Sequence, residues 1–291
     1  MYNQPLAEIF GFPAGNLSKE AMRYRRLRLC PFNNRVPNCT KDKADNPLGV
    51  CSVFTEDGIA ITCPVRFRQE WLVAEDAAGF FFPEGTLWTS LTEVRLNDTK
   101  GESAGNIDVV LVAYDAQGKV TDFGALEIQG VYISGNVRRP FEHYMENPKA
   151  NAEMNWRGKL NYPRPDYLSS SRKRLVPQLL YKGGILNSWG KKIAVALDKG
   201  FFETLPELKT TDSKNADIAW MVYDLEFIES SNTYSIKRSR TVYTQFHEAM
   251  DTIARPSVGP INEFLDRLQE KLDEKLENGG KPETKTIDLG D

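Results

Sequence analysis

Histidine is almost absent from this sequence: only His143 and His247 occur in 291 residues. A histidine-rich metal site, or an enzyme of the HNH type, is therefore nearly excluded. No apolar run reaches the length of a membrane span. The amino terminus also lacks the basic segment and apolar core of a signal peptide. These absences predict a protein that does not enter the membrane and that resides in the cytoplasm.

The chain has no excess of positive charge. Its 37 Lys and Arg residues face 40 Asp and Glu residues, which leaves a net charge of −3. This balance argues against bulk electrostatic attraction to nucleic acid, although a local basic cleft would still bind it. Because 41% of the residues are hydrophobic and 26% are charged, we expect an ordinary soluble globular protein.

Cysteine is also scarce, and all four residues lie before residue 64: Cys30, Cys39, Cys51 and Cys63. In a reducing compartment they are expected to be thiols or metal ligands rather than disulfides. Residues 30–50 show no secondary-structure period, and such a loop buries too little apolar surface to offset its ordering entropy. A tetrahedral four-thiolate metal centre would supply the missing stabilisation. The wide spacing leaves four unrelated buried thiols as the alternative.

A basic segment precedes the cysteines. Asn16 is a candidate N-cap for a helix over residues 17–29. Four arginines cluster on this helix: Arg23, Arg25, Arg26 and Arg28. They are interpreted either as an arm that contacts phosphates or as a solvated helix face.

The most informative stretch is a predicted hairpin. Two β-rich runs, residues 106–114 and 120–133, flank a short polar loop that contains a glycine. If Gln117 and Gly118 form a two-residue loop, antiparallel pairing places Asp108 opposite Glu127. Alternation of side chains puts Glu127 and Gln129 on the same face. The sequence therefore predicts two carboxylates directly across from each other.

Opposed carboxylates repel, so they do not stabilise a sheet. A divalent cation between them would remove the repulsion, and this predicts a site for a hard metal with oxygen ligands. A strand predicted over residues 87–96 would bring Glu93 to the same place. The alternative is an ordinary hairpin whose exposed face carries two acids and a glutamine.

Asp108, followed on the next strand by Glu127-Ile128-Gln129, resembles the PD-(D/E)XK nuclease motif with Gln129 in place of lysine. The Glu-x-Gln ending and the four upstream cysteines are similar to the NotI group of type II restriction endonucleases. This resemblance covers about residues 30–135. It implies Mg²⁺ held by Asp108 and Glu127 with help from Glu93. Gln129 would orient water or contact the phosphate. It also implies a structural iron site at the four cysteines, for which zinc has equally suitable ligands.

The expected fold class is α/β: a PD-(D/E)XK restriction-endonuclease-like core, with a mixed sheet flanked by helices, and an N-terminal metal-binding lobe built on the four cysteines. The expected divisions are residues 1–65 for the helix and the four-cysteine lobe, 66–278 for the nuclease core, and 279–291 for a disordered tail. Within the core we expect a helix over residues 65–78 and a long polar loop after residue 135. A helix over residues 169–181 should end at Gly183 and Gly184. A buried strand over residues 193–197, a second hairpin over residues 217–245 and a last helix from residue 261, packed on the core, complete the expectation.

The resemblance implies cleavage of double-stranded DNA at a GC-rich palindrome. One motif in each chain then implies a homodimer. A cognate DNA methyltransferase is the expected functional partner. The residues predicted to contact DNA are basic: Arg25, Arg26, Arg35, Arg138, Arg139, Arg157, Arg172 and Lys173. Two alternatives stay open, namely a non-catalytic DNA-binding protein with a cysteine-bound metal fold, and a repair-type nuclease without sequence specificity.

Overall fold

The computed structural model describes residues 2–33, 36–43 and 45–277. Arg35 and the predicted tail over residues 279–291 therefore lie outside the described residues. The chain divides into two compact units, Met1–Ala254 and Arg255–Asp291. The boundary predicted after residue 65 falls inside the first unit.

A six-stranded mixed sheet forms the centre of the first unit, in the order β12-β11-β10-β7-β6-β5. β7 is parallel to β10 and β10 is parallel to β11, whereas the outer pairs are antiparallel. The strands span Trp88–Asn97 (β5), Ser103–Tyr114 (β6), Val120–Gln129 (β7), Ile193–Asp198 (β10), Ile218–Ile228 (β11) and Thr233–Thr244 (β12). The predicted α/β architecture with a mixed sheet is confirmed.

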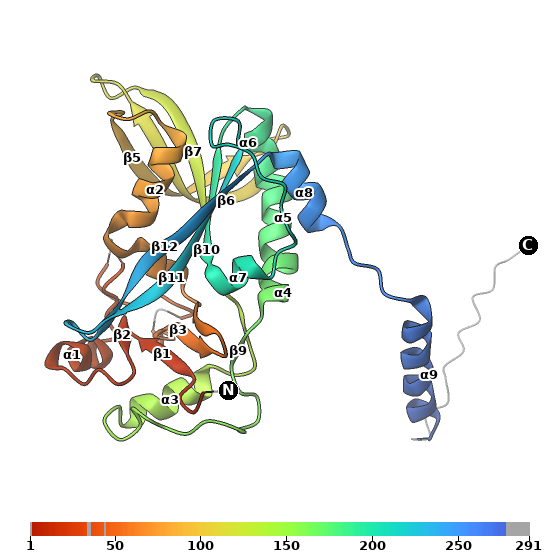
Figure 1. Cartoon of the computed structure of the whole chain (residues 1–291). Coiled ribbons are helices and arrows are strands. Elements are labelled where there is room, and N and C mark those ends of the chain that lie inside the picture. Colours follow the sequence, from red (N-terminus) through yellow and green to blue (C-terminus); the bar gives the residue numbers. More distant parts are fainter. Residues whose placement is uncertain (1, 34–35, 44, 278–291) are drawn as a thin grey trace, which may run out of the picture. The chain divides into compact units, whose positions relative to one another are not determined.

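Helices cover both faces of this sheet (Figure 1). On one face, α2 (Leu72–Phe81) packs its apolar side against Ala194 and Ala196 of β10. Val195 and Leu197 alternate to the other face, where they share a core with Leu179. All six residues of β10 are buried, as expected for a central parallel strand covered on both sides.

The second face is covered by one helical run between β7 and β10. It comprises α4 (Tyr167–Ser170), η2 (Ser171–Leu175), α5 (Val176–Gln178), η3 (Leu179–Gly183) and α6 (Gly184–Ser188). The predicted stop at Gly183 and Gly184 is wrong, because both glycines continue the helix. A Cβ on Gly183 would lie 2.7 Å from the ring of Phe246. This glycine therefore allows close packing of α8 (Phe246–Ala254), rather than ending the helix.

The N-terminal lobe contains a sheet that the sequence did not predict, in the order β2-β1-β3-β4. Its strands are Leu6–Ile9 (β1), Phe12–Pro13 (β2), Val50–Thr55 (β3) and Gly58–Ile61 (β4). Leu6, Ile9, Val50 and Val53 are fully buried in it. The lobe thus has an apolar core of its own. This core is formed by strands that flank the loop over residues 30–50, from which a lack of apolar burial was expected.

Several local predictions need correction. Helix α1 (Lys19–Leu27) is capped by Ser18, whose hydroxyl accepts from the Ala21 amide at 3.2 Å, and not by Asn16. The predicted helix over residues 65–78 divides into η1 (Pro64–Trp71) and α2, and η1 itself is broken by the non-helical residues Gln69 and Glu70. Residues after 135 are not one long loop: they include α3 (Arg138–Glu146) and β9 (Arg164–Pro165), and β9 pairs with β8 (Ile133–Ser134).

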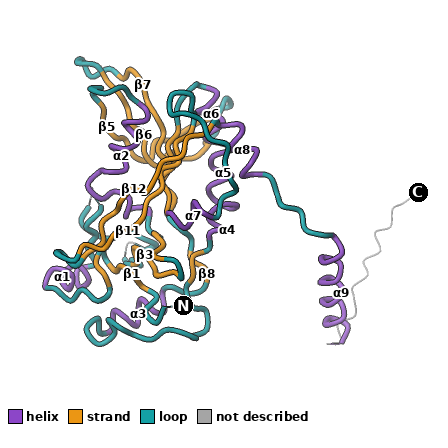
Figure 2. The backbone as a smooth tube through the Cα atoms, in the orientation of Figure 1, coloured by secondary structure: helices purple, strands orange, loops and turns teal. Residues whose placement is uncertain are grey.

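The hairpin of β11 and β12 extends from the sheet to the N-terminal lobe (Figure 2). At its tip the Asn232 carbonyl accepts from the Asn16 side chain at 2.7 Å. A short helix, α7 (Lys199–Glu203), follows β10, and its N-cap Asp198 also accepts from the Ile61 amide of β4 at 3.1 Å. These bonds join the lobe to the central sheet.

The second unit contains one described helix, α9 (Ile261–Glu277), where the sequence predicted it. None of its residues is buried within this unit. Across residues 2–33, 36–43 and 45–277, no helix combines the length and apolar character needed to cross a membrane.

Candidate active site

Three neighbouring strands bring Glu93, Asp108 and Glu127 to the same part of the sheet. The ladder between β6 and β7 includes Val110 with Ala125 and Val109 with Leu126, so the next step along the two strands is Asp108 beside Glu127. This is the predicted register. The predicted two-residue loop is wrong, however, because Asp115 and Lys119 close a longer turn. A register shift next to Tyr114 compensates for the extra residues.

Asp108 lies where the ladder between β6 and β7 ends. Its Oδ2 accepts from the Ile128 amide at 2.9 Å, so a carboxylate oxygen takes the place of the backbone carbonyl that would accept this bond in a regular ladder. Burial raises the pKa of Asp108, while the Ile128 amide, Lys182 and Arg68 act in the opposite direction. Glu93 adds to the upward shift of this pKa, which indicates that the two carboxylates are electrostatic neighbours.

Glu93 faces Asp108 from the edge strand β5. Thr92 pairs with Val109 and Val94 pairs with Ile107, but the ladder omits Glu93 between them. Its φ is 55°, a left-handed conformation that a glutamate rarely adopts within a strand. Backbone strain of this kind is concentrated at functional sites. The left-handed conformation of Glu93 interrupts the β5 ladder at the position opposite Asp108.

Glu127 is the most enclosed acid of the group, with 2% of its surface exposed. Burial, and then the nearby charge of Asp108, raise the pKa of Glu127 to about 7. Its Oε2 accepts from the Lys182 ammonium at 2.6 Å. Its Oε1 is buried without a hydrogen-bond partner in the described part of the chain. An orphaned carboxylate oxygen beside a second carboxylate has the chemistry of an oxygen ligand for a hard cation.

Lys182 was missed by the sequence analysis. It lies in η3, 55 residues after Glu127, and its side chain is 7% exposed. A signal existed: Leu175, Leu179 and Leu186 follow helical spacing, and Lys182 occupies the same stripe. A lysine within the apolar stripe of a helix must find a buried partner.

Gln129 lies on the same strand as Glu127 and is also buried. Its amide Nε2 donates to Oε1 of Gln178 at 3.3 Å, so it contacts the helical run that carries Lys182. A glutamine amide supplies hydrogen bonds but no positive charge. The positive group nearest to the two carboxylates therefore comes from the helix, not from the strand motif.

The predicted DNA-contacting residues divide into two groups. Arg25 is 1% exposed, and its guanidinium donates to the carbonyls of Asn16 and Pro13, both at 2.7 Å, so it has a structural role. Arg138, at the start of α3, pairs with Asp42 and with Glu142. The other described candidates are exposed: Arg26, Arg139, Arg157, Arg172 and Lys173. Arg35 lies outside the described residues.

The four cysteines gather in the N-terminal lobe. The Cys63 amide donates to the Cys51 carbonyl, and the Cys30 amide donates to the carbonyl of Pro37, two residues before Cys39. Burial raises the pKa of Cys30 to about 11, and the charges of Cys63 and Cys39 add to this shift. All four are free thiols.

Across the described residues, no group of three or more His, Cys, Asp or Glu side chains is placed to hold a metal ion. The prediction of a structural iron or zinc site at Cys30, Cys39, Cys51 and Cys63 is therefore not supported. The expected metal was to stabilise a lobe that lacked an apolar core. The sheet of the lobe supplies such a core, so this reason for a metal site does not apply. At the carboxylates, Asp108 and Glu127 fit a hard cation as a pair, with Glu127 Oε1 as the open ligand atom.

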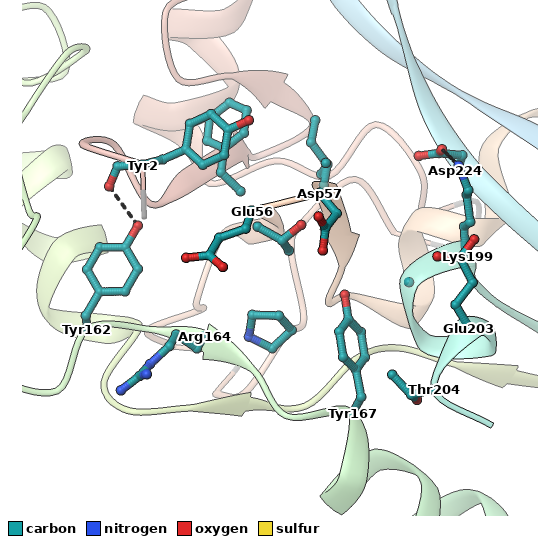
Figure 3. A pocket seen from close by; sticks show the side chains of 16 residues that line it. Tyr2, Glu56, Asp57, Tyr162, Arg164, Tyr167, Lys199, Glu203, Thr204 and Asp224 are labelled. Atoms are coloured by element: carbon teal, nitrogen blue, oxygen red, sulfur yellow. Dashed lines mark hydrogen bonds and ion pairs between the residues drawn. The ribbon is translucent and has the colours of Figure 1, made fainter. Parts of the chain in front are cut away.

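A cavity of about 670 Å³ opens elsewhere, between β4, β9 and α7 (Figure 3). Its lining includes the acids Glu56, Asp57, Glu203 and Asp224, and the Tyr162 hydroxyl donates to the Tyr2 carbonyl at 2.9 Å beside it. None of the predicted catalytic residues lines it. Because these four acids outnumber the two basic residues of the lining, Arg164 and Lys199, the cavity is poorly suited to a phosphate backbone.

The comparisons with known proteins point to one family. The family model described as Restriction endonuclease NotI matches residues 16–236, well over half of the chain. The match contains Glu93, Asp108, Glu127, Gln129 and Lys182, as well as the four cysteines. No curated protein matched the chain.

Proposed function

The chain belongs to the family of the restriction endonuclease NotI, and on that premise we propose that it is a Mg²⁺-dependent type II enzyme that cuts double-stranded DNA at one specific sequence. An enzyme of this family is a site-specific deoxyribonuclease and therefore a hydrolase. The proposal adds the metal, the catalytic residues and the kind of recognition site.

One observation supports the proposal: continuing the observed register by one step brings Glu93, Asp108 and Glu127 to neighbouring positions of β5, β6 and β7. The mixed sheet with a helical crossover between β7 and β10 supports a PD-(D/E)XK core, with Gln129 at the lysine position. Three acids at one place gain no folding stability from one another, since like charges across a strand pair repel. A functional cation is the simplest reason to keep them together.

Asp108 and Glu127 would hold Mg²⁺, and Glu93 would assist through a metal-bound water. When bound, the ion lowers the pKa of its water and stabilises the charge that develops on the phosphate. Asp108 Oδ2 accepts from the Ile128 amide, so Oδ1 would be the oxygen that binds the ion. Gln129 would orient the attacking water or contact the scissile phosphate through its amide.

Recognition would use exposed basic residues outside the carboxylate site. Arg139, Arg157, Arg172 and Lys173 are the candidates for contacts to phosphates or bases, together with Arg26 on α1. Bidentate arginines read guanine in the major groove, in agreement with a GC-rich site. We do not assign such a role to Arg25, because its guanidinium is bonded inside the protein.

The chain carries one set of catalytic carboxylates, so cutting both strands of a palindrome requires two copies. We therefore propose a homodimer whose two-fold axis coincides with that of the DNA site. The same DNA sequence would occur in the genome of the host. A methyltransferase that modifies this sequence is the expected functional partner.

The test is digestion of GC-rich genomic or bacteriophage DNA by the purified protein, with Mg²⁺ and with EDTA. Discrete fragments that need Mg²⁺ are expected, and sequencing their ends gives the recognition site and the cut position. A smear would instead indicate a repair-type nuclease without sequence preference. DNA binding without any cleavage would indicate a non-catalytic DNA-binding protein.

A further inference from the structure

The buried contact between Lys182 and Glu127 is not part of the strand motif. The Lys182 Nζ lies 2.6 Å from Glu127 Oε2, and the two side chains are 7% and 3% exposed. A second bond joins the same ammonium to the Asn106 carbonyl of β6 at 2.9 Å. Lys182 thus spans β6 and β7 at the position of the two acids.

A buried ion pair of this kind is a poor device for stability alone. Removing two charges from water costs several kcal/mol, and well-packed apolar residues of similar volume often stabilise a protein equally well or better. The stripe that carries Lys182 is otherwise apolar, with Leu175 and Leu179 buried on the same side. The placement of a lysine at this one position, directly under a catalytic carboxylate, favours a role in the reaction.

The two oxygens of Glu127 have different surroundings. Oε2 is occupied by Lys182, whereas Oε1 has no hydrogen-bond partner within the described residues. The ammonium carries three N–H donors, and Glu127 and Asn106 use two of them. Holding one oxygen fixes the orientation of the carboxylate, and the other oxygen is left for a cation.

We propose that Lys182 is a positioning residue for the DNA cleavage reaction: its ammonium holds Glu127 Oε2, and this directs Oε1 to the catalytic cation. It also supplies, from a helix, the positive charge that Gln129 cannot supply from β7. This inference rests on the proposed function, because it assumes that Glu127 is a metal ligand. Residues that orient a metal ligand from behind commonly change metal affinity or activity by about 10–100-fold.

Two neighbouring residues fit this role less well. The Gln129 amide donates to Gln178 and not to Glu127. Arg68 acts on Asp108 as one of several charges, after Lys182 in magnitude. Among the basic side chains near the acids, Lys182 is the one with a described hydrogen bond to a predicted metal ligand.

The test compares Lys182→Met, Lys182→Gln and Lys182→Arg with the wild type and with a matched control. The control is Lys191→Met, which breaks a 2.6 Å pair with Asp122 on the same strand, β7, but at an exposed place. Three quantities are measured in each protein: the single-turnover cleavage rate in Mg²⁺, the dissociation constant of Mn²⁺ by electron paramagnetic resonance, and the melting temperature. Glu127→Gln, expected to lose the ion, shows that Mn²⁺ is bound at this carboxylate.

The expected signature of Lys182→Met, in protein that is folded at the assay temperature, is a loss in two readouts. Cleavage should slow by about 10–100-fold because the carboxylate is no longer held. Mn²⁺ should bind more weakly, by a factor of the same order, because Glu127 Oε1 is no longer directed at the ion. Lys182→Arg should keep more of the cleavage rate than Lys182→Met, and Lys191→Met should behave as the wild type in both assays.

Two outcomes would overturn the inference: cleavage by a folded Lys182→Met close to the wild-type rate, or Mn²⁺ binding that is unchanged or tighter. Partial unfolding would also weaken both readouts, so only variants whose melting curves show them fully folded at the assay temperature are compared. If Lys182→Met does not fold, Lys182→Gln is used in its place. A wild type that cuts no DNA would count against the proposed function, while the Mn²⁺ measurement would still test the contact between Lys182 and Glu127.

Discussion

Two regions of this chain carry side chains that the sequence predicts as metal ligands, and the fold arranges them differently. On the central sheet, strand pairing brings Glu93, Asp108 and Glu127 to one place. In the N-terminal lobe, the four cysteines share a neighbourhood by way of an irregular loop, and in neither region do three or more side chains form a metal-holding group among the described residues. The comparison teaches that a regular ladder makes proximity predictable from sequence spacing, whereas in an irregular loop the spacing does not say how the side chains meet.

The two regions also differ in what surrounds them. The acids lie where burial costs free energy, and the pKa of Glu127 is accordingly raised to about 7. The cysteines lie beside an apolar sheet core in which a neutral thiol is well tolerated. The acids of the central sheet are therefore kept at a cost in folding stability, whereas the cysteines of the N-terminal lobe contribute to it. Five sets of substitutions sharpen or break this contrast.

The largest effect is expected at the carboxylates. Asp108→Ala and Glu127→Ala should each lower DNA cleavage by on the order of 1000-fold, as loss of a main transition-state contact does. Binding to the recognition sequence, measured by fluorescence anisotropy in Ca²⁺, should stay close to that of the wild type. Substantial cleavage by either variant would contradict the assignment of the site.

The next largest effect is expected in the N-terminal lobe, at a fully buried ion pair. The Arg66 guanidinium lies 3.1 Å from Glu8, and both side chains are 0% exposed. Arg66→Met would leave the Glu8 carboxylate buried without its partner, at a cost of about 3–5 kcal/mol in the free energy of unfolding. Urea denaturation measures this cost. The double variant Glu8→Gln with Arg66→Met is the control, and it should recover part of the loss.

A smaller loss is expected at the cysteines. Cys51 is buried, and Cys51→Ser would place a hydroxyl in that environment, at a cost of about 1–3 kcal/mol in the free energy of unfolding. Cleavage should not change, because Cys51 belongs to the lobe and not to the carboxylate site. Metal analysis of the same preparations checks this account. A stoichiometric metal that is lost with the substitution would show that the cysteines do form a ligand set.

Strain at Glu93 should appear as a difference between two variants that both lack the carboxylate. At a φ of 55°, glycine is free of the Cβ clash that alanine has. Glu93→Gly should therefore be more stable to unfolding than Glu93→Ala by about 1 kcal/mol. Both should cleave DNA more slowly than the wild type. Equal stability in a denaturation experiment would show that the backbone relaxes and stores no strain.

The last effect concerns the pH dependence of stability and a buried acid outside the site. Burial raises the pKa of Asp198 to about 7, against 3.8 for a free aspartate. Between these values the folded protein holds a proton that the unfolded chain has lost, so this group makes stability fall as pH rises through that range. In Asp198→Asn that contribution to the slope should disappear. Melting temperatures measured from pH 4 to pH 8 test it, and a parallel profile in the variant would refute it.

Much of the central sheet follows from the sequence. The alternation of β6 and β7 and the position of their turn are local properties, and together they predict that Asp108 reaches Glu127 even though the turn itself is longer. The second hairpin and the buried strand β10 are likewise confirmed. The N-terminal sheet escaped prediction because its strands are short and because β1 and β3 pair across more than forty residues.

By itself, the sequence determined which acids share a strand face and which residues form the hairpin, because alternation along a strand depends only on neighbouring residues. Only the tertiary structure decided which group would balance those acids. Lys182 reaches Glu127 because a helical run crosses the face of the sheet, and Gly183 beside it lets α8 pack close. The cysteines had the residue types of a metal site, but their arrangement depended on how the lobe folds around an apolar core. Contacts of this kind come from packing between distant segments, which no local pattern encodes.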